Sequence, residues 1–199
     1  MNEFEESLTS NQSVFGVNLT SAVVSNLSAY YSLLLRWNPR LHLVAPCSPE
    51  EFATRHVLES LMLLKHLPAG ATVADIGSGA GLPIIPCLIA RPDLKATLIE
   101  SSPKKSVFLK EALNTVGRNA IIIARPFEEV ETPAVSFITC RALDQFIDKV
   151  PLIIQWAPRG SSLLLFGGET LREKLDEIKI RNQEFRLPLS EKRSLFVVA

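Results

Sequence analysis

Three glycines at every second position, Gly77, Gly79 and Gly81, closely follow a carboxylate at Asp75. An apolar stretch over residues 72–76 leads into them and a helical pattern follows, so the order is strand, glycine-rich turn, helix. Glycine adopts positive φ and lets a ligand approach the backbone closely, which suits a nucleotide-like cofactor. The spacing is D-x-G-x-G-x-G, whereas the dinucleotide fingerprint is G-x-G-x-x-G.

The carboxylate before the glycines helps to choose between cofactors. A pyrophosphate uses the helix N-terminus as an anion site, and a carboxylate at Asp75 repels it. S-adenosylmethionine carries an ammonium group and a sulfonium but no phosphate, so this loop favours S-adenosylmethionine over NAD. A tight turn without a ligand and an NAD-dependent oxidoreductase are the alternatives that the spacing disfavours. The loop residues expected to bind the cofactor are Asp75, Gly77, Ser78, Gly79, Gly81 and Leu82.

Glu100 is a second acidic residue at the end of a predicted strand. Open α/β sheets bind ligands at the carboxyl ends of their strands, where an acid can bind both ribose hydroxyls. The alternative is a helix cap or a solvated charge, because Ser101-Ser102-Pro103 follows directly. Together with the glycine loop, we expect Glu100 to bind the cofactor ribose.

The segment Arg125-Pro126-Phe127-Glu128-Glu129 closes the third predicted strand. The ring of Phe127 beside backbone amides could sandwich an adenine, with Glu128 near its amino group. A loop that leads into an acidic helix start is an equally good interpretation.

Arg141 follows the fourth predicted strand. In α/β folds that bind S-adenosylmethionine, this position faces the reacting methyl group. Its guanidinium could bind the cofactor carboxylate or a substrate phosphate in a bidentate fork. A structural ion pair with Asp144 or Glu100 is the alternative. The sequence contains no Asn-Pro-Pro-aromatic or Asp-Pro-Pro-aromatic motif, which enzymes that methylate exocyclic amines use, so that target group is disfavoured.

Alternating strands and helices must position these residues. Strands are predicted at 71–76, 95–100, 120–124, 135–140 and 161–166, with helices at 82–90, 103–116 and 143–156 between them. This alternation is typical of a parallel sheet with helices on both faces. After a helix over 170–180, runs at 183–188 and 193–198 predict an antiparallel hairpin at the sheet edge. The order favours a class I S-adenosylmethionine-dependent methyltransferase (Rossmann-like) α/β sheet, mostly parallel with a C-terminal antiparallel hairpin.

The N-terminal part of the chain has a different pattern. Apolar residues recur at helical spacing over 20–37, and Pro39 is expected to end that helix. A second helix is predicted over 48–67, with Ser48 as its N-cap. The polar, acidic residues 1–12 are expected to be loosely ordered. We therefore expect an N-terminal helical extension over 1–68, packed on a Rossmann-like methyltransferase domain over 69–199.

Composition limits the function classes. The 199 residues contain 21 Lys+Arg and 21 Asp+Glu, and this neutral balance argues against a protein that coats nucleic acid through its overall charge. No signal peptide or membrane-spanning stretch is apparent, and the three cysteines lack metal-ligand spacing. We expect a cytoplasmic protein, a monomer, that binds no metal and no membrane.

Several segments together resemble the RsmG family, also called glucose-inhibited division protein B or GidB. Its members are bacterial methyltransferases that act on guanine N7 of small-subunit ribosomal RNA. The resemblance covers about residues 20–168. The matching segments are Tyr31-x5-Trp37-Asn38, Arg40-Leu41-x-Leu43, Arg55-His56-Val57-Leu58-Glu59-Ser60-Leu61, Asp75-Ile76-Gly77-Ser78-Gly79-Ala80-Gly81-Leu82-Pro83, Glu100-Ser101, Lys104-Lys105-x2-Phe108-Leu109 and Cys140-Arg141-Ala142.

The chain departs from the family pattern at several positions. Glu59 replaces an aspartate, and Ile84 stands where the family usually has glycine after the loop proline. Ser136 stands in place of an aspartate that begins the fourth strand. Phe166 replaces the lysine of a Lys-Gly pair that closes the fifth strand. Cofactor binding is expected to be intact, whereas these changes concern the substrate side.

The resemblance implies a function and a partner. It implies transfer of a methyl group from S-adenosylmethionine to N7 of a guanine in 16S ribosomal RNA, with the RNA or the 30S particle as partner. Arg141 is then the residue expected to orient the cofactor carboxylate or the target nucleotide. Two alternatives remain: a methyltransferase for a small molecule or protein, and a cofactor-binding, ribosome-associated protein that has lost catalysis. The second is motivated by Ile84 and Phe166.

Overall fold

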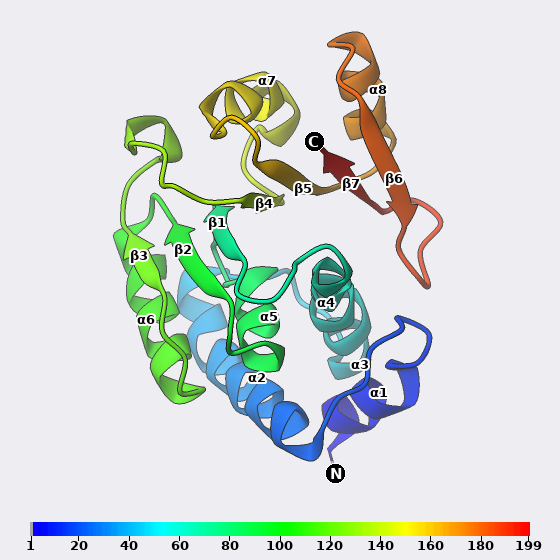
Figure 1. Ribbon diagram of the computed structural model, residues 1–199. Helices are drawn as coiled ribbons and strands as arrows, with labels where there is room; N and C mark the ends of the chain where they lie inside the picture. Colours follow the sequence, from blue (N-terminus) through cyan, green and yellow to red (C-terminus); the bar gives the residue numbers. More distant parts are fainter. Residues whose placement is uncertain (1) are drawn as a thin grey trace.

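A seven-stranded sheet lies between two layers of helices in the computed structural model, which describes residues 2–199 (Figure 1). The strands are β1 Thr72–Ile76, β2 Lys95–Ile99, β3 Ile121–Ile123, β4 Phe137–Arg141, β5 Ser162–Gly167, β6 Asn182–Arg186 and β7 Ser194–Val198. The α-helices are α1 Glu3–Asn11, α2 Ser21–Leu41, α3 Pro49–Glu51, α4 Glu59–Leu61, α5 Ile84–Ala90, α6 Pro103–Thr115, α7 Phe146–Trp156 and α8 Glu169–Glu177. The π-helix η1 is Phe52–Leu58, and the 3-10 helices are η2 Met62–Lys65 and η3 Phe127–Glu129.

The strand order is β3-β2-β1-β4-β5-β7-β6. β1 pairs in parallel with β2 on one side and with β4 on the other. The pairs β2–β3 and β4–β5 are parallel as well. β7 is antiparallel to both β5 and β6, so it lies between them. This confirms the predicted mixed sheet with its C-terminal hairpin. The order reverses next to β1, and open α/β sheets bind ligands at such a switch point.

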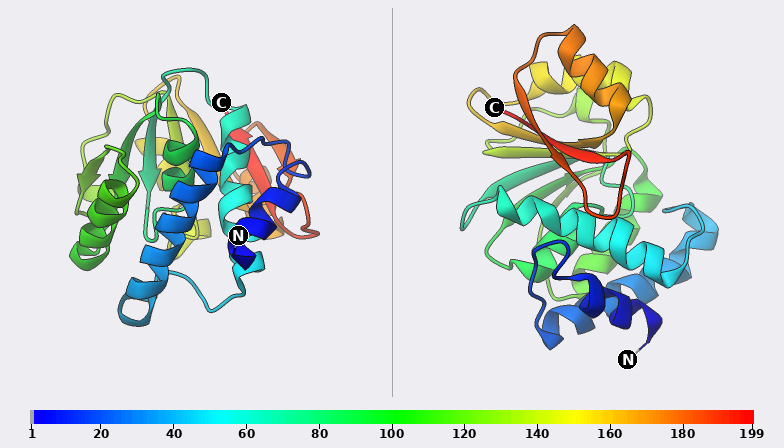
Figure 2. Two further views of the ribbon diagram at one scale, coloured as in Figure 1. Left: turned by 90° about the horizontal axis from the view of Figure 1, so that it is seen from below. Right: turned by 90° about the vertical axis from the view of Figure 1, so that its right-hand side faces the viewer.

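Helices cover both faces of the sheet (Figure 2), and an apolar core lies on each face. The first joins the sheet to α1, α2, α5, α6 and the helices between residues 49 and 65. The second joins the sheet to α7 and α8. Because both faces are covered, the central strands are apolar almost throughout, as parallel sheets require. The N-terminal helices share their core with the sheet, and a domain boundary at residue 68 stays a prediction.

The expectation that residues 1–12 are loosely ordered is wrong for residues 2–12, and residue 1 lies outside the described residues. Asn2 and Glu5 form a reciprocal capping box at the start of α1. The ring of Phe4 is 1% exposed and stacks on Tyr31, with 4.5 Å between ring centroids. The segment looked unstructured because its few apolar residues sit among many polar ones, and only the packing against α2 reveals its partner.

Pro39 does not end α2, which continues to Leu41 and closes at His42 in the left-handed conformation. A proline in the last turn removes only one intrahelical hydrogen bond, so the helix tolerates it there. The side chain of Asn38 then fixes the chain after the helix, because it bonds both the N–H and the carbonyl of Val44 at 3.0 and 3.1 Å.

The predicted helix over 48–67 is a helical run of changing type: α3, η1, α4 and η2. Ser48 is its N-cap, as expected, and accepts the Glu51 N–H at 3.0 Å. The middle of the run is the π-helix η1, a form that often occurs at functional sites. This segment carries Arg55, His56 and Glu59 toward the end of β4.

Candidate functional site

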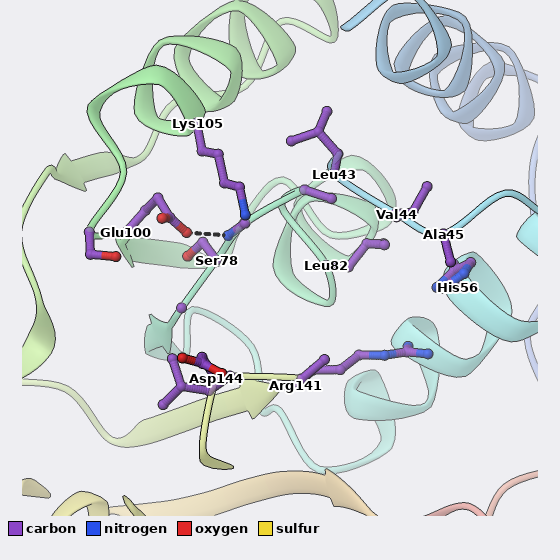
Figure 3. A pocket seen from close by; sticks show the side chains of 16 residues that line it. Leu43, Val44, Ala45, His56, Ser78, Leu82, Glu100, Lys105, Arg141 and Asp144 are labelled. Carbon is purple, nitrogen blue, oxygen red and sulfur yellow. Dashed lines mark hydrogen bonds between the residues drawn. The ribbon is translucent and has the colours of Figure 1, made fainter. Parts of the chain in front are cut away.

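A cavity of about 360 Å³ opens at the carboxyl ends of β1, β2 and β4 (Figure 3). We call it the first cavity. Its lining includes Gly77, Ser78 and Gly79 from the loop after β1, Glu100 after β2, and Arg141 at the end of β4. The sheet therefore brings sequence-distant segments to one edge, where the predicted glycine loop and both predicted strand-end residues meet.

The glycine loop is tied to the neighbouring strand by its backbone. The N–H groups of Gly77 and Ser78 both donate to the carbonyl of Ile99, at 2.9 and 3.1 Å. Gly77 has φ +68, and a Cβ there would lie 2.6 Å from a methyl carbon of Leu143. Only glycine fits this position without displacing that side chain. From the other side, the Tyr30 hydroxyl donates to the carbonyl of Ala80 at 2.6 Å, so α2 helps to fix the loop.

Glu100 lies at the junction of the loop and α6. Its Oε2 accepts the Gly79 N–H at 2.7 Å (Figure 3), and its Oε1 accepts the Ser102 N–H at 2.8 Å. The helix cap itself is Ser102, whose hydroxyl accepts from Lys105. A carboxylate oxygen can accept a second hydrogen bond. Glu100 therefore keeps acceptor capacity at the wall of the first cavity.

Asp75 lies beneath the loop and is not among the residues that line the first cavity. Its Oδ1 accepts the hydroxyl of Thr139 at 2.6 Å, whereas Oδ2 has no hydrogen-bond partner within residues 2–199. Burial raises the pKa of this carboxyl to about 7, although the hydrogen bond from Thr139 and the nearby hydroxyl of Ser78 oppose the shift. Gly81 is likewise not among the lining residues, and a Cβ there would lie 2.4 Å from Ile85.

The side chains of Phe127 and Glu128 are not brought to the first cavity, contrary to the expectation for an adenine site. The Phe127 ring is 3% exposed and packs edge-on against Trp156 at 5.9 Å. Glu128 forms an ion pair with Lys149 at 3.0 Å. The apolar ring turns inward under α7, so neither side chain lines the cavity in this arrangement of the loop.

Arg141 pairs with Glu59, not with Asp144 or Glu100, the partners named in the alternative structural interpretation. Its Nη2 donates to Glu59 Oε2 at 3.0 Å and to the carbonyl of Arg55 at 2.7 Å. Its Nη1 is buried and has no hydrogen-bond partner within residues 2–199. Figure 3 shows the side chain reaching from the end of β4 toward His56. The N-terminal helices therefore hold the residue that we expected to orient the ligands.

Glu59 was noted in the sequence only as a replacement for a family aspartate, and Arg193 was missed. Glu59 is 1% exposed, and its Oε1 accepts from Arg193 Nε and Nη2 at 3.0 and 2.7 Å. An acidic residue within an apolar helical row was the available signal, because a buried charge requires partners. The partner could not be foreseen, since Arg193 lies at the other end of the chain.

A second cavity of about 260 Å³ adjoins the first, with Arg141, His56 and Ala142 lining both. Its other lining residues are Arg55, Glu59, Phe146, Phe166, Gly167, Leu187 and Arg193. Burial, together with the charges of Arg141, Arg55 and Arg193, lowers the pKa of His56 to about 3, so its imidazole is neutral near pH 7. Ala142 has φ +55, a strained conformation for a non-glycine residue that is often found at functional sites.

Membrane-spanning and metal-binding features are absent from residues 2–199. No helix in that range is long and apolar enough to cross a bilayer. No group of three or more His, Cys, Asp or Glu side chains there is arranged to hold a metal ion.

Sequence comparison identifies a family. Residues 23–197 match the family model GidB, described as rRNA small subunit methyltransferase G. A protein of Sorangium cellulosum named "Ribosomal RNA small subunit methyltransferase G" is 36% identical over 180 residues, covering 86% of this chain and 75% of that protein. A protein of the same name from Xanthomonas campestris pv. campestris (strain B100) is 38% identical over 160 residues, covering 79% of this chain and 75% of that protein.

Solved structures share the fold. A methyltransferase from Pyrococcus furiosus superposes with a TM-score of 0.58 at 10% identity, covering 87% of this chain and 97% of that chain. The P. horikoshii protein TYW2, solved in complex with MeSAdo, gives a TM-score of 0.54 at 16% identity, covering 72% and 61%. At these identities the likeness concerns the fold, which is that of methyltransferases.

Proposed function

The chain belongs to the GidB family of rRNA small subunit methyltransferases, and from that premise we propose that it transfers a methyl group from S-adenosylmethionine to N7 of a guanine in 16S ribosomal RNA. One observation carries the proposal for the site: the two cavities adjoin and share Arg141, His56 and Ala142. The first has the glycine loop and strand-end acid of a cofactor site. The second is rich in arginine, which suits a nucleic acid.

The lining of the first cavity, together with the carboxylate of Asp75 beneath its glycine loop, fits S-adenosylmethionine. Asp75 Oδ2 is a buried carboxylate oxygen without a partner, and an ammonium group supplies both the charge and the donor that it lacks. Glu100 retains acceptor capacity for ribose hydroxyls, and Gly79 leaves open backbone beside it. Two carboxylates at one site disfavour a phosphate-bearing cofactor. We assign Asp75 to the ammonium and Glu100 to the ribose.

The reaction requires the side chains mainly to position the two reactants. When bound, S-adenosylmethionine supplies an electrophilic methyl group; the lone pair of N7 forms the new C–N bond and the C–S bond breaks with its electrons passing to sulfur. N7 carries no proton, so no general base is needed. This agrees with the state of His56, which lines both cavities. Its pKa is lowered to about 3, so its imidazole is a weak base that stays neutral near pH 7. Catalysis then rests on holding the reacting atoms about 3–3.5 Å apart.

The assignment of Asp75 predicts proton-linked cofactor binding. Below its pKa of about 7 the carboxyl is protonated and cannot pair with an ammonium, so affinity should rise with pH. At pH 6 roughly one tenth of the carboxyl is ionised, whereas at pH 7.5 most of it is and an α-amino group is still largely charged. Affinity should therefore increase about fivefold over this interval. Calorimetry in buffers of different ionisation enthalpy should detect nearly one proton released at pH 6.

The matched variant is Asp75→Asn, which keeps an oxygen acceptor for Thr139 but does not titrate. Its cofactor affinity should be weaker and nearly independent of pH between 6 and 7.5. Equal pH dependence in the variant and the wild type would assign the proton to another group and remove Asp75 from the ammonium site.

The partner is the small-subunit RNA, either free or assembled in the 30S particle. A neutral net charge of 21 basic against 21 acidic residues suits recognition through a local patch, and Arg55, Arg141 and Arg193 line the second cavity. The residues assigned to the site come from one chain. We infer that the protein works as a monomer in the cytoplasm, without a metal.

Transfer of a labelled methyl group tests the function. Small subunits, and RNA extracted from them, are taken from cells that lack this protein and incubated with labelled S-adenosylmethionine. Label is expected in RNA. Label in ribosomal protein would support a different methyltransferase, and cofactor binding without transfer would support a protein that has lost catalysis.

A further inference from the structure

We propose that the second cavity binds the target guanine and that Glu59 is a positioning residue for it. Glu59 holds the guanidinium groups of Arg141 and Arg193 so that free N–H groups point to O6 of the base. This inference rests on the proposed function, because it takes a guanine of RNA as the methyl acceptor. It adds which residues select the base.

The place of the second cavity suits a methyl acceptor. It adjoins the first cavity, because Arg141, His56 and Ala142 line both. A base held there presents one edge toward the cofactor cavity, as a direct displacement requires. Its volume of about 260 Å³ accommodates one nucleobase rather than a folded RNA segment. The target nucleotide must therefore be unstacked to enter.

The charged side chains that line the second cavity offer donors and almost no free acceptor. Glu59 is 1% exposed, with Oε1 occupied by Arg193 and Oε2 by Arg141. By contrast, Arg141 Nη1 has no hydrogen-bond partner within residues 2–199. Guanine presents two acceptors, O6 and N7, on one edge, whereas adenine has an amino donor in place of O6. A donor-rich cavity therefore selects guanine over adenine.

The apolar lining suits the faces of a base. Phe146, Phe166 and Leu187 line the second cavity, and the Arg141 guanidinium lies 5.2 Å from the centre of the Phe166 ring. Unstacked bases are commonly held between aromatic side chains and guanidinium planes. Phe166 pairs in register with Arg141 at the ends of β5 and β4, so the sheet fixes both.

Glu59 also reduces the repulsion between the arginines and the methylated base. Methylation at N7 moves a positive charge onto the guanine, and arginines alone would oppose it. The Glu59 carboxylate lies within 3.0 Å of both guanidinium groups and offsets part of their charge. Removing the charge at Glu59 should therefore weaken base binding and also slow transfer.

Nucleotide binding tests the selection directly. The protein is first saturated with S-adenosylhomocysteine, so that adenosine 5′-monophosphate cannot occupy the cofactor cavity. Guanosine, inosine and adenosine 5′-monophosphates are then titrated and followed by saturation-transfer NMR. Guanosine and inosine monophosphates, which both have O6, should bind about tenfold more tightly than adenosine monophosphate, as expected for one charge-assisted hydrogen bond.

The variants Glu59→Gln and Phe166→Leu should separate the polar and the stacking contributions. Glu59→Gln should reduce the preference for guanosine monophosphate to about twofold, whereas Phe166→Leu should weaken all three nucleotides alike. Glu184→Gln is the matched control, because Glu184 also pairs with an arginine, Arg172, but lines neither cavity. The control should keep wild-type discrimination, and all three variants should bind S-adenosylhomocysteine within about twofold of wild type.

Equal binding of adenosine and guanosine monophosphates would overturn the proposal, as would unchanged discrimination in folded Glu59→Gln. Loss of guanosine monophosphate binding when S-adenosylhomocysteine is present would place the nucleotide in the cofactor cavity and overturn it as well. In each case methyl transfer to small subunits by the wild-type protein would show that the proposed function still holds.

Discussion

Replacing Gly79 by valine should weaken S-adenosylmethionine binding by about a hundredfold, roughly 2.8 kcal/mol. Gly79 lines the first cavity and its N–H donates to Glu100 at 2.7 Å. Its φ of +51 is unfavourable for a β-branched residue, so the valine would shift this backbone away from Glu100. The added side chain would also take space beside Glu100, the residue that we assign to the ribose. Calorimetric titration with the cofactor measures the effect.

Gly117→Val is the matched control. Gly117 has φ +61, and a Cβ added there would meet nothing within 4 Å, so the variant carries the same backbone strain at a site remote from the first cavity. The free energy of unfolding should fall by a similar amount in both variants, about 1–3 kcal/mol, because each holds a valine in a strained backbone conformation. A folded Gly79→Val protein with unchanged cofactor affinity would contradict the assignment of the first cavity.

Replacing Arg141 by lysine should lower kcat/KM for small subunits by about a hundredfold, because small displacements of a positioning group are costly. Lysine keeps the positive charge beside Glu59 but loses the planar fork that spans Glu59, the carbonyl of Arg55 and the second cavity. Arg141→Ala is a poorer probe. It breaks a buried ion pair, which costs about 3–5 kcal/mol, and so confounds activity with stability.

The control for this change is Arg172→Lys, which alters another arginine–carboxylate pair, with Glu184, away from both cavities. Melting temperature and S-adenosylhomocysteine affinity are measured with the transfer rate. Arg141→Lys should melt within a few degrees of the control and lose far more activity. Losses of stability and activity in proportion would make Arg141 a structural residue only.

The sequence predicted the sheet well because strand and helix periods alternate clearly after residue 70. The glycine spacing and Glu100 predicted residues that line the first cavity, since both are local signals at strand ends. Local signals could not show that Asp75 lies beneath the loop. A carboxylate at the end of a strand looks the same in sequence whether it faces a cavity or the core.

The other half of the site depends on contacts between distant segments. Arg141 belongs to β4, Glu59 to α4, and Arg193 directly precedes β7, so their pairing follows from tertiary packing alone. The same limit applies to α1, whose Phe4 is buried only because Tyr31 and Phe52 surround it. Phe127 was assigned to the cavity from its place after a strand, but its apolar ring packs under Trp156 instead.

The chemical identity of the product tests the central claim most directly. Small subunits from cells that lack this protein are incubated with it and with S-adenosylmethionine that carries a deuterated methyl group. The 16S RNA is then digested and its nucleosides are analysed by mass spectrometry. Deuterated N7-methylguanosine is the expected product, and Gly79→Val should fail to form it while Gly117→Val forms it normally. A deuterated methyl group on another nucleoside, or none at all from a protein that binds the cofactor, would contradict transfer to guanine N7.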